Sequence, residues 1–478
     1  MIKLLLRETI EAMSGLVRGV APTRSVTGVT TDSRAVAAGE LFFALRGENA
    51  DGHEFAPAAL RAGAAGAVIA SSEAPRVADA VRGQDAAGVL IEVDDPRAAL
   101  GRLAAFHRRL GSARVVAVAG SNGKTTTKSL IDHLLRGRFR GACSPKSFNN
   151  DIGVPLTMLS SQSGDDYLIV EIGTNAPGEI AQLTALARPD VGVITCIGEE
   201  HLAGLGDLDG VAREETALLA TMPRGGFAAI NVDWPRIREF LPDPGPALAT
   251  FGAADSGADL RVTRAVQLDP GRDEGPWLEF ELNGRWSFRL PVLGAFNAWN
   301  AAAAVLVARR FGMDYEEIAA RMPSFVPPPM RAEALQHAGA TIINDAYNAN
   351  PHSALAAIET LESLPARGRR VFVFGEMREL GAHAASLHLR VARRLRTAKI
   401  DHIMLVGAAV ALMAREWGDN TLFGPTVEHC ETLERCAERL AESLRPGDVA
   451  LLKASRSIGL DRVVAMLRTA APQPAASG

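Results

Sequence analysis

One short stretch constrains the fold of this chain more than any other. A run rich in β-branched residues begins at Val115, the loop Gly120-Ser121-Asn122-Gly123-Lys124-Thr125 follows, and residues 129–136 have a helical pattern. Glycines let successive backbone N–H groups turn onto phosphate oxygens, the lysine adds positive charge, and the threonine offers a hydroxyl to Mg²⁺. The loop is the shorter Gly-x-x-Gly-Lys-Thr form of the phosphate-binding loop (P-loop), and it predicts that the chain binds a nucleoside triphosphate.

The size and charge of the chain limit the remaining possibilities. At 478 residues it exceeds what one hydrophobic core usually supports, so we expect about three domains. A composition of 47% hydrophobic and 22% charged residues is typical of a soluble enzyme. The net charge of -4 argues against a general affinity for nucleic acid.

The compartment is predicted from the N-terminus and the cysteines. Residues 1–10 lack the character of a secretory signal, and no stretch is long enough for stable membrane insertion. The four cysteines have no metal-binding spacing, and the pair Cys430 and Cys436 falls in a segment predicted to be helical. We therefore expect a reduced, cytoplasmic protein that acts as a monomer.

Strands and helices alternate along most of the chain, which predicts an α/β fold with three domains. We assign a small α/β domain to residues 1–88, a central P-loop domain with a doubly wound, mostly parallel sheet to residues 89–325, and a Rossmann-like domain to residues 326–478. Runs at residues 260–268 and 277–290 look like antiparallel additions to the central sheet. The prolines within residues 323–329 predict an extended linker, residues 427–444 are predicted to be helical, and residues 472–478 to be disordered.

Polar side chains follow several predicted strands, where ligands of open α/β sheets bind. Glu171 ends one apolar strand and is a candidate Mg²⁺ ligand, while His201 follows the next strand. Beyond the linker, residues 344–351 and 375–381 are polar runs in equivalent positions. Each of these runs, taken alone, is also compatible with a simple turn.

Several segments together resemble the Mur ligases and the related folylpolyglutamate synthetases, which join a carboxylate to an amine at the expense of ATP. The loop at 120–127 carries this resemblance, and residues 31–34, 149–155, 345–351, 375–381 and 453–457 extend it over essentially the whole chain. These segments are most similar to the branch of the Mur ligases that adds a dipeptide. The resemblance implies UDP-N-acetylmuramoyl-tripeptide and D-alanyl-D-alanine as substrates, ATP and Mg²⁺ as cofactors, and an acyl-phosphate intermediate.

The resemblance also implies roles for individual residues. Lys124, Glu171 and His201 would be catalytic. Thr125 would hold one Mg²⁺ together with the ATP phosphates, and Glu171 and His201 would bind a second metal ion. ATP would be bound by Gly120, Ser121, Asn122, Gly123, Lys124, Thr125, Thr126, Asn297, Asn300, Arg331 and Asp345. The sugar nucleotide would lie by Thr31, Asp32, Ser33, Arg34, Asn49 and Asp51, and its muramoyl peptide by Asn149 and Asn150. The dipeptide and phosphate side would be formed by Tyr347, Asn348, Asn350, Ser455 and Arg456. Closure about the linker near Pro327 would complete the site, so we expect an open and a closed form.

One position departs from the family pattern. The family usually has a lysine, carbamoylated to serve as a Mg²⁺ ligand, on the helix after the histidine motif, and residues 210–216 contain none. Glu215 takes that place, and a carboxylate keeps the charge and the oxygen donor but is several ångströms shorter. Either Glu215 helps to hold the metal through water or a shifted helix, or it is an ordinary surface residue.

Three alternatives remain open. A sister Mur ligase would add a diamino acid to a dipeptide precursor, but the chain lacks an Asp-Asn-Pro-Arg segment. A folate polyglutamylating ligase would lack the uridine-binding first domain. An NTP-driven switch or binding module could use the same P-loop without joining any substrates.

Overall fold

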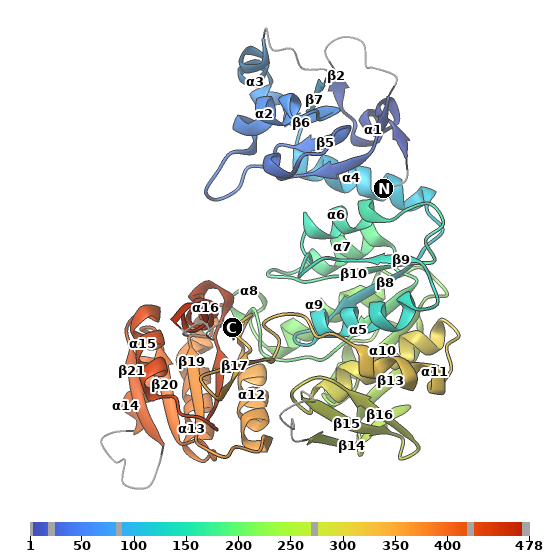
Figure 1. The fold of residues 1–478 in the computed structure, drawn as a ribbon. Coiled ribbons are helices and arrows are strands. Elements are labelled where there is room, and N and C mark those ends of the chain that lie inside the picture. Colours follow the sequence, from blue (N-terminus) through green and yellow to red (C-terminus); the bar gives the residue numbers. More distant parts are fainter. Residues whose placement is uncertain (1–2, 18–23, 83–87, 269–275, 418–424, 471–478) are drawn as a thin grey trace, which may run out of the picture.

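The described residues of the computed structural model form three large sheets, each covered by helices, and one two-stranded sheet (Figure 1). It describes residues 3–17, 24–82, 88–268, 276–417 and 425–470. The mixed α/β class and the mostly parallel central sheet confirm the predicted fold class. The predicted disorder of residues 472–478 lies outside the described residues.

The N-terminal unit is built on a five-stranded sheet in which only β2 is antiparallel. In sheet order its strands are β2 (Leu16–Val17), β7 (Val89–Val93), β6 (Gly66–Ala70), β5 (Glu40–Phe43) and β4 (Gly28–Thr30). Beside it are the pair β1 (Leu4–Leu5) and β3 (Ser25–Val26) and the helices α1 (Leu6–Met13), α2 (Ala56–Arg61) and α3 (Ala74–Val81). Strand β7 continues this sheet past residue 88, and the domain boundaries stay a prediction.

The central unit carries the P-loop on the strand β8 (Arg114–Ala119) of a nine-stranded sheet. From one edge the order is β9 (Gly141–Cys143), β10 (Tyr167–Glu171), β8, β11 (Val191–Ile194), β12 (Phe227–Asn231), β13 (Ala247–Ala253), β14 (Leu260–Leu268), β15 (Trp277–Leu282) and β16 (Trp286–Leu290). The strands from β9 to β14 pair in parallel, and β15 and β16 are antiparallel.

Helices cover both faces of this sheet because the β8 side chains alternate. Val116 and Val118 pack with α5 (Lys124–Arg136) and α10 (Asn297–Arg310), and Val115 and Ala117 belong to the opposite core. That second face is covered by α4 (Pro96–Leu110), α6 (Gly153–Ser160), α7 (Glu179–Ala187) and α9 (Leu208–Ala220). The unit also contains α8 (Leu202–Leu205) and α11 (Tyr315–Arg321).

Two expectations about this sheet need correction. The run at 277–290 is two strands, because Asn283 and Gly284 both have positive φ (56° and 63°) and turn the chain into a hairpin. The run at 260–268 forms β14, which is antiparallel to β15 but parallel to β13, so it is not a purely antiparallel addition.

The C-terminal unit has a six-stranded sheet in which β17 (Glu333–His337) alone is antiparallel. The order continues with β18 (Ala340–Asn344), β22 (Val449–Lys453), β19 (Arg370–Gly375), β20 (His402–Val406) and β21 (Thr426–Cys430). The helices are α12 (Pro351–Ser363), α13 (Ala384–Arg396), α14 (Ala411–Trp417), α15 (Leu433–Ser443) and α16 (Asp461–Ala470).

The prediction of a helix over residues 427–444 was wrong. Strand β21 comes first, and Thr432 starts α15 by accepting a hydrogen bond from the Arg435 N–H. Cys430 therefore lies on a strand, and Cys436 on the helix packed beside it. The linker predicted at residues 323–329 is only partly extended: residues 325–328 have no regular structure, but Pro323 and Ser324 belong to a 3-10 helix (Met322–Ser324) and Pro329 to a turn. Within the described ranges, no helix combines the length and the apolar character needed to cross a bilayer.

Candidate active site

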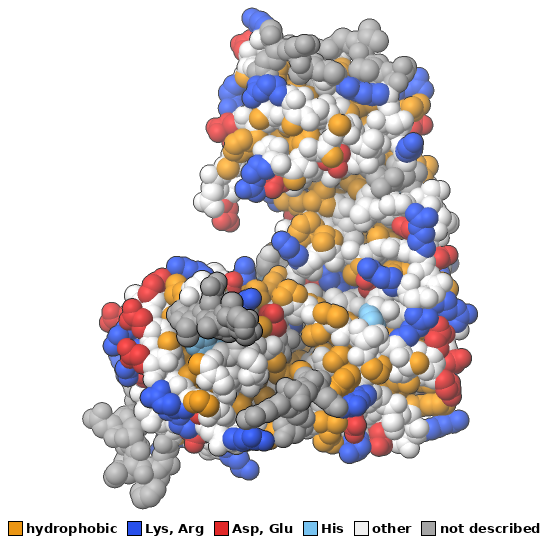
Figure 2. Space-filling view, viewed as in Figure 1, with side chains coloured by type: hydrophobic (Ala, Val, Ile, Leu, Met, Phe, Trp, Pro, Cys, Tyr) orange, Lys and Arg blue, Asp and Glu red, His pale blue; other side chains and the backbone are white. Residues whose placement is uncertain are grey.

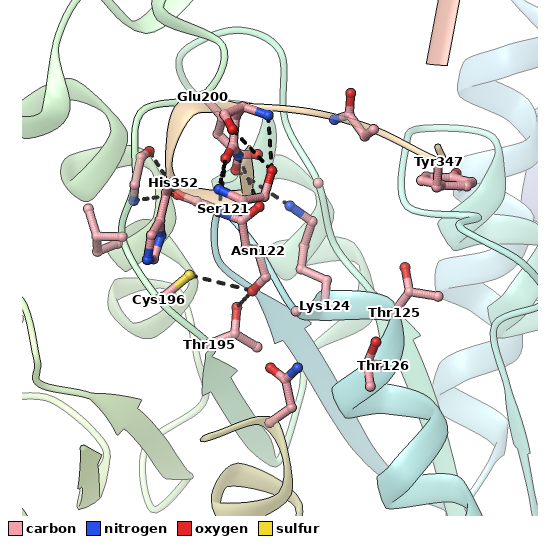
Figure 3. A pocket seen from close by; sticks show the side chains of 18 of the residues that line it. Ser121, Asn122, Lys124, Thr125, Thr126, Thr195, Cys196, Glu200, Tyr347 and His352 are labelled. Carbon is pink, nitrogen blue, oxygen red and sulfur yellow. Dashed lines mark hydrogen bonds and ion pairs between the residues drawn. The ribbon is translucent and has the colours of Figure 1, made fainter. Parts of the chain in front are cut away.

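A large cavity, about 1220 Å³, lies where the central and C-terminal units meet. Its walls come from the P-loop, from the carboxyl ends of β10 and β11, from the start of α10, and from residues just after the linker and after β18. Figure 3 shows this cavity from close by, with Lys124 directed toward Glu200 and Tyr347 on another wall. The carboxyl ends of two parallel sheets thus face one site, as expected for ligand sites of open α/β sheets.

The P-loop requires glycine at both of its glycine positions. Gly120 and Gly123 have φ angles of +116° and +85°, and a Cβ on them would lie 2.3 Å from Thr195 Oγ1 and 2.2 Å from Asn300 Oδ1, respectively. The loop is further fixed by Thr195, whose hydroxyl donates to the Asn122 carbonyl at 2.5 Å (Figure 3). The backbone is therefore held in a phosphate-binding shape at the start of α5.

Lys124 is surrounded by buried carboxylates. Its Nζ donates to the Gly120 carbonyl at 2.6 Å and lies 3.5 Å from Glu200 Oε1. Burial lowers the pKa of Lys124, but the carboxylates of Glu200, Glu215 and Glu171 outweigh burial and raise the pKa. The lysine is thus kept charged for an anionic ligand.

The interpretation of Glu215 as a surface residue was wrong, since its exposed fraction is 1%. Its Oε2 accepts the Gly120 N–H at 2.6 Å, and its buried Oε1 has no hydrogen-bond partner among the described residues. Burial raises the pKa of Glu215 to about 7. Burial likewise raises the pKa of Glu200, so two acidic groups next to Lys124 lack full compensation.

The oxygen atoms around Thr125 are suitable ligands for Mg²⁺ bound together with a nucleotide. The Thr125 hydroxyl donates to Glu171 Oε2 at 3.0 Å, and both are hard oxygen donors of the kind that Mg²⁺ prefers. The carboxyl group of Glu215, which has one unpartnered oxygen, interacts electrostatically with Lys124 of the same loop. In the part of the chain that the structure describes, no cluster of three or more His, Cys, Asp or Glu could hold a metal unaided, so phosphates and waters would supply the remaining ligands.

His201 faces the C-terminal unit. Its Nδ1 lies 2.5 Å from Glu379 Oε2, and its Nε2 lies 3.8 Å from Glu200 Oε2. Burial lowers the pKa of His201, but the nearby carboxylates of Glu379 and Glu200 outweigh burial and raise the pKa. His201 and Glu171 both line the cavity but have different partners here, and their shared role in metal binding stays a prediction.

The C-terminal unit reaches the P-loop directly. Arg331 Nη2 donates to Thr125 Oγ1 at 3.1 Å, and its guanidinium lies 4.0 Å from the centre of the Tyr347 ring. The amides of Asn350 and Asn122 pair, with N···O distances of 3.0 and 3.4 Å. The structure therefore brings residues more than 200 positions apart around one loop.

Other predicted residues also line this cavity. Asp345 Oδ2 lies 2.6 Å from Lys453 Nζ, which also donates to the Asn348 carbonyl at 3.1 Å. Asn297 and Asn300 are buried at the start of α10, and Asn300 Nδ2 donates a hydrogen bond to Asn297 Oδ1 at 2.8 Å.

The two asparagines predicted for the muramoyl side have structural partners. Asn149 Nδ2 donates to Glu171 Oε1 at 3.1 Å. Asn150 Oδ1 accepts hydrogen bonds from the N–H groups of Ile152 and Gly153, at the start of α6. Both side chains line the cavity.

A second set of predicted residues does not line the cavity: Thr31, Asp32, Ser33, Arg34, Asn49, Asp51, Gly120, Glu215, Ser455 and Arg456. Asp32 and Arg34 form an exposed ion pair at 2.8 Å, while Asp51 is bonded to His53, Arg46 and Arg76. The Ser455 hydroxyl bonds the backbone of residues 349 and 378. Arg456 lies 3.2 Å from Asp461 Oδ2.

Sequence reasoning missed four residues of this region. Glu200 and Glu199 stand beside His201, but only the histidine was singled out; Glu199 forms a two-pronged ion pair with Arg390 from α13, at 2.7 and 2.9 Å. Lys128, directly before the predicted helix of residues 129–136, was given no role, yet its buried Nζ lies 3.1 Å from Glu171 Oε2. Its spacing of four from Lys124 was the available signal, because such residues share one helix face.

Comparisons with known proteins agree with this geometry. Three family models match: "Mur ligase family, catalytic domain" over residues 25–108, "Mur ligase middle domain" over 118–308 and "Mur ligase, glutamate ligase domain" over 330–456. The UDP-N-acetylmuramoyl-tripeptide--D-alanyl-D-alanine ligase of Bacillus subtilis is 33% identical, covering 96% of this chain and 98% of its own length. The Escherichia coli enzyme of that name is 32% identical, with coverages of 98% and 99%.

Solved structures give the same result. A crystal structure of MurF from Acinetobacter baumannii has a TM-score of 0.83 at 28% identity, covering 98% of this chain and 99% of that chain. MurF ligase from Thermotoga maritima in complex with ADP has a TM-score of 0.76 at 26% identity, with coverages of 92% and 97%. The chain therefore belongs to the Mur ligase family.

Proposed function

We propose that this chain joins D-alanyl-D-alanine to UDP-N-acetylmuramoyl-tripeptide, with ATP converted to ADP and phosphate, to give the pentapeptide precursor of peptidoglycan. The observation that carries the proposal is the P-loop at a cavity completed by the C-terminal unit, in a chain whose near full-length relatives bear that activity in their names. The relative solved with ADP supports a nucleotide in this cavity.

The chemistry requires two anions to meet. Amide formation in water is uphill, so the tripeptide carboxylate first takes the γ-phosphoryl group of ATP and becomes an acyl phosphate. Lys124 and Arg331 supply positive charge at the point of transfer, and the glycine loop supplies backbone N–H donors. Mg²⁺ held by Thr125 and Glu171, when bound, would neutralise phosphate charge.

The second step joins the amine to the activated acid. The dipeptide amine attacks the acyl carbon, the C–N bond forms, the amine loses a proton, and phosphate leaves with the electrons of the C–O bond. Tyr347, Asn348 and Asn350 belong to the wall that the C-terminal unit contributes, which favours dipeptide entry from that side. Packing of this unit against the P-loop would keep water from the acyl phosphate.

The UDP end of the long substrate is proposed to lie on the N-terminal unit, near residues 31–34 and 49–51. The surface is hollowed between the N-terminal and C-terminal units (Figure 2), which leaves room for an extended molecule reaching toward the cavity. A monomer acting in the cytoplasm remains part of this proposal.

Glu215 is proposed to take part in metal binding through its unpartnered oxygen. The test is the Mg²⁺ dependence of turnover in Glu215→Ala, which should need a higher Mg²⁺ concentration. Unchanged Mg²⁺ dependence and turnover would leave Glu215 with only its hydrogen bond to Gly120.

The function is tested by incubating the purified protein with ATP, Mg²⁺ and a panel of acceptors and amines. We expect ADP release only when the muramoyl tripeptide and D-alanyl-D-alanine are both present, and a product whose mass equals their sum less one water. Preference for a muramoyl dipeptide and a diamino acid would favour the sister ligase. ATP hydrolysis at the same rate with and without the two substrates would favour an NTP-driven switch or binding module.

A further inference from the structure

We propose that Lys128 is a positioning residue of this reaction: its buried ammonium holds the loop of residues 144–149 and Glu171 in register with the P-loop helix. The inference rests on the proposed function, because it assigns the residue to the coupling of the nucleotide half of the site to the muramoyl half. Lys128 itself does not line the cavity, so it would act through the groups that it holds.

The ammonium has more acceptors than protons. It lies 2.7 Å from the Ser144 carbonyl, 2.9 Å from Ser144 Oγ and 3.1 Å from Glu171 Oε2, and it also donates to the Lys146 carbonyl. Three N–H donors are thus shared among four oxygens. A buried lysine is costly unless it is paired and fully hydrogen-bonded, and Lys128 meets both conditions.

Glu171 is the first group that Lys128 holds in place. The same carboxylate accepts from Thr125 Oγ1 at 3.0 Å and from Asn149 Nδ2 at 3.1 Å. It therefore touches the P-loop with one oxygen and the 144–149 loop with the other. With Lys128 as its fixed counterion, the carboxylate cannot turn away without losing a buried ion pair.

The loop of residues 144–149 is the second part of the structure that Lys128 holds in place. Lys146 has a φ of +47°, which is unfavourable for a lysine, and its carbonyl is one of the groups bound by the ammonium. Next along the chain, Ser147 Oγ lies 3.2 Å from Thr125 Oγ1. Asn149, which ends the loop, lines the cavity and is a candidate for the muramoyl peptide.

These contacts explain why a second lysine stands one turn after Lys124. Lys124 lines the cavity, whereas Lys128 lies outside it and connects α5 to the end of β10 and to the loop after β9. Removing its charge should misplace Asn149 and Glu171 while leaving the glycine loop, whose shape is set by its own backbone contacts, able to bind nucleotide.

The test compares Lys128→Met, Lys128→Arg and the milder Ser144→Ala with Lys399→Met, which changes an exposed lysine far along the chain. Calorimetry measures binding of ADP and, separately, of UDP-N-acetylmuramoyl-tripeptide, and steady-state kinetics give KM and kcat. For Lys128→Met we expect muramoyl-substrate binding to weaken by about tenfold or more, which is about 1.4 kcal/mol, with ADP affinity changed less than about twofold. Lys128→Arg should restore part of the loss, and Ser144→Ala should weaken binding in the same direction but less.

Several outcomes would overturn the inference. Equal losses of ADP and muramoyl binding, or a folded Lys128→Met protein with unchanged KM values, would reduce Lys128 to a packing role. If Lys128→Met does not fold, Ser144→Ala provides the test. Unchanged affinity of that variant for UDP-N-acetylmuramoyl-tripeptide would contradict the inference. Wild-type protein that makes no pentapeptide product would instead refute the proposed function, while the binding measurements would still report on Lys128.

Discussion

The ion pair between Glu199 and Arg390 joins the central and C-terminal units, so its removal should shift the molecule toward an open form. Both N–H···O contacts are short, at 2.7 and 2.9 Å, and the guanidinium meets the carboxylate with two nitrogens. The hydrogen bond from Arg390 also lowers the pKa of Glu199, consistent with a charged pair.

The magnitude follows from the exposure of the two side chains, which is 42% for Arg390 and 26% for Glu199. Solvent screens a pair of this kind, so we take about 1 kcal/mol, the upper end for exposed pairs. Because 1.4 kcal/mol is a factor of ten, the ratio of closed to open molecules should fall by about fivefold.

The assay is small-angle scattering of the ligand-free protein and of the protein with ADP, fitted as a mixture of closed and open forms. Glu199→Gln and Arg390→Met should each lower the closed fraction, and the double variant should lower it no further, since the two residues form one interaction. Arg393→Met is the matched control, because Arg393 is 71% exposed on the same helix and 3.7 Å from Glu416. Independent, multiplying effects of the two substitutions, or a shift no larger than in the control, would refute the reasoning. Identical profiles for every protein with and without ADP would refute closure itself.

Three further predictions concern single residues. Lys124→Ala should lower kcat/KM in the ADP-release assay by about 10²- to 10³-fold, the range for losing one preorganised charge donor; a full synthetic rate would contradict the assigned site. Glu171→Gln should raise the Mg²⁺ concentration for half-maximal turnover by about tenfold or more, since an amide is a poorer ligand for a hard cation; an unchanged Mg²⁺ titration would exclude Glu171 as a ligand. Burial lowers the pKa of His107 from 6.5 to about 4, so the folded state favours the neutral ring and the unfolded state takes up the proton first. In urea unfolding, the free energy of unfolding of the wild type should therefore fall by about 3 kcal/mol more between pH 7 and pH 4 than that of His107→Gln. Equal pH dependence of the two proteins would contradict this.

Local sequence signals predicted the parts of this fold that depend on local physics. The glycines of the P-loop, the apolar strand before it and the helix after it are visible in one short segment. The strand β21 and the hairpin at Asn283 were harder to predict, because short strands carry few alternating residues and a two-residue turn interrupts the pattern only briefly. Strand-end positions also predicted where Glu171 and His201 would lie, since parallel strands present their carboxyl ends at one edge.

The partners of the site residues depend on contacts that no local pattern contains. Glu199, Glu200 and His201 are consecutive, yet they face Arg390, Lys124 and Glu379, from three different elements. A spacing of four could have shown that Lys124 and Lys128 share a helix face, but not that β10 and the loop after β9 would converge beneath it. This convergence is set by the order of strands in the sheet, in which β10 lies between β8 and β9. Once that order is known, a second buried lysine under the P-loop has a physical reason: the carboxylate at the end of β10 needs a counterion that holds it in place before and after the nucleotide binds.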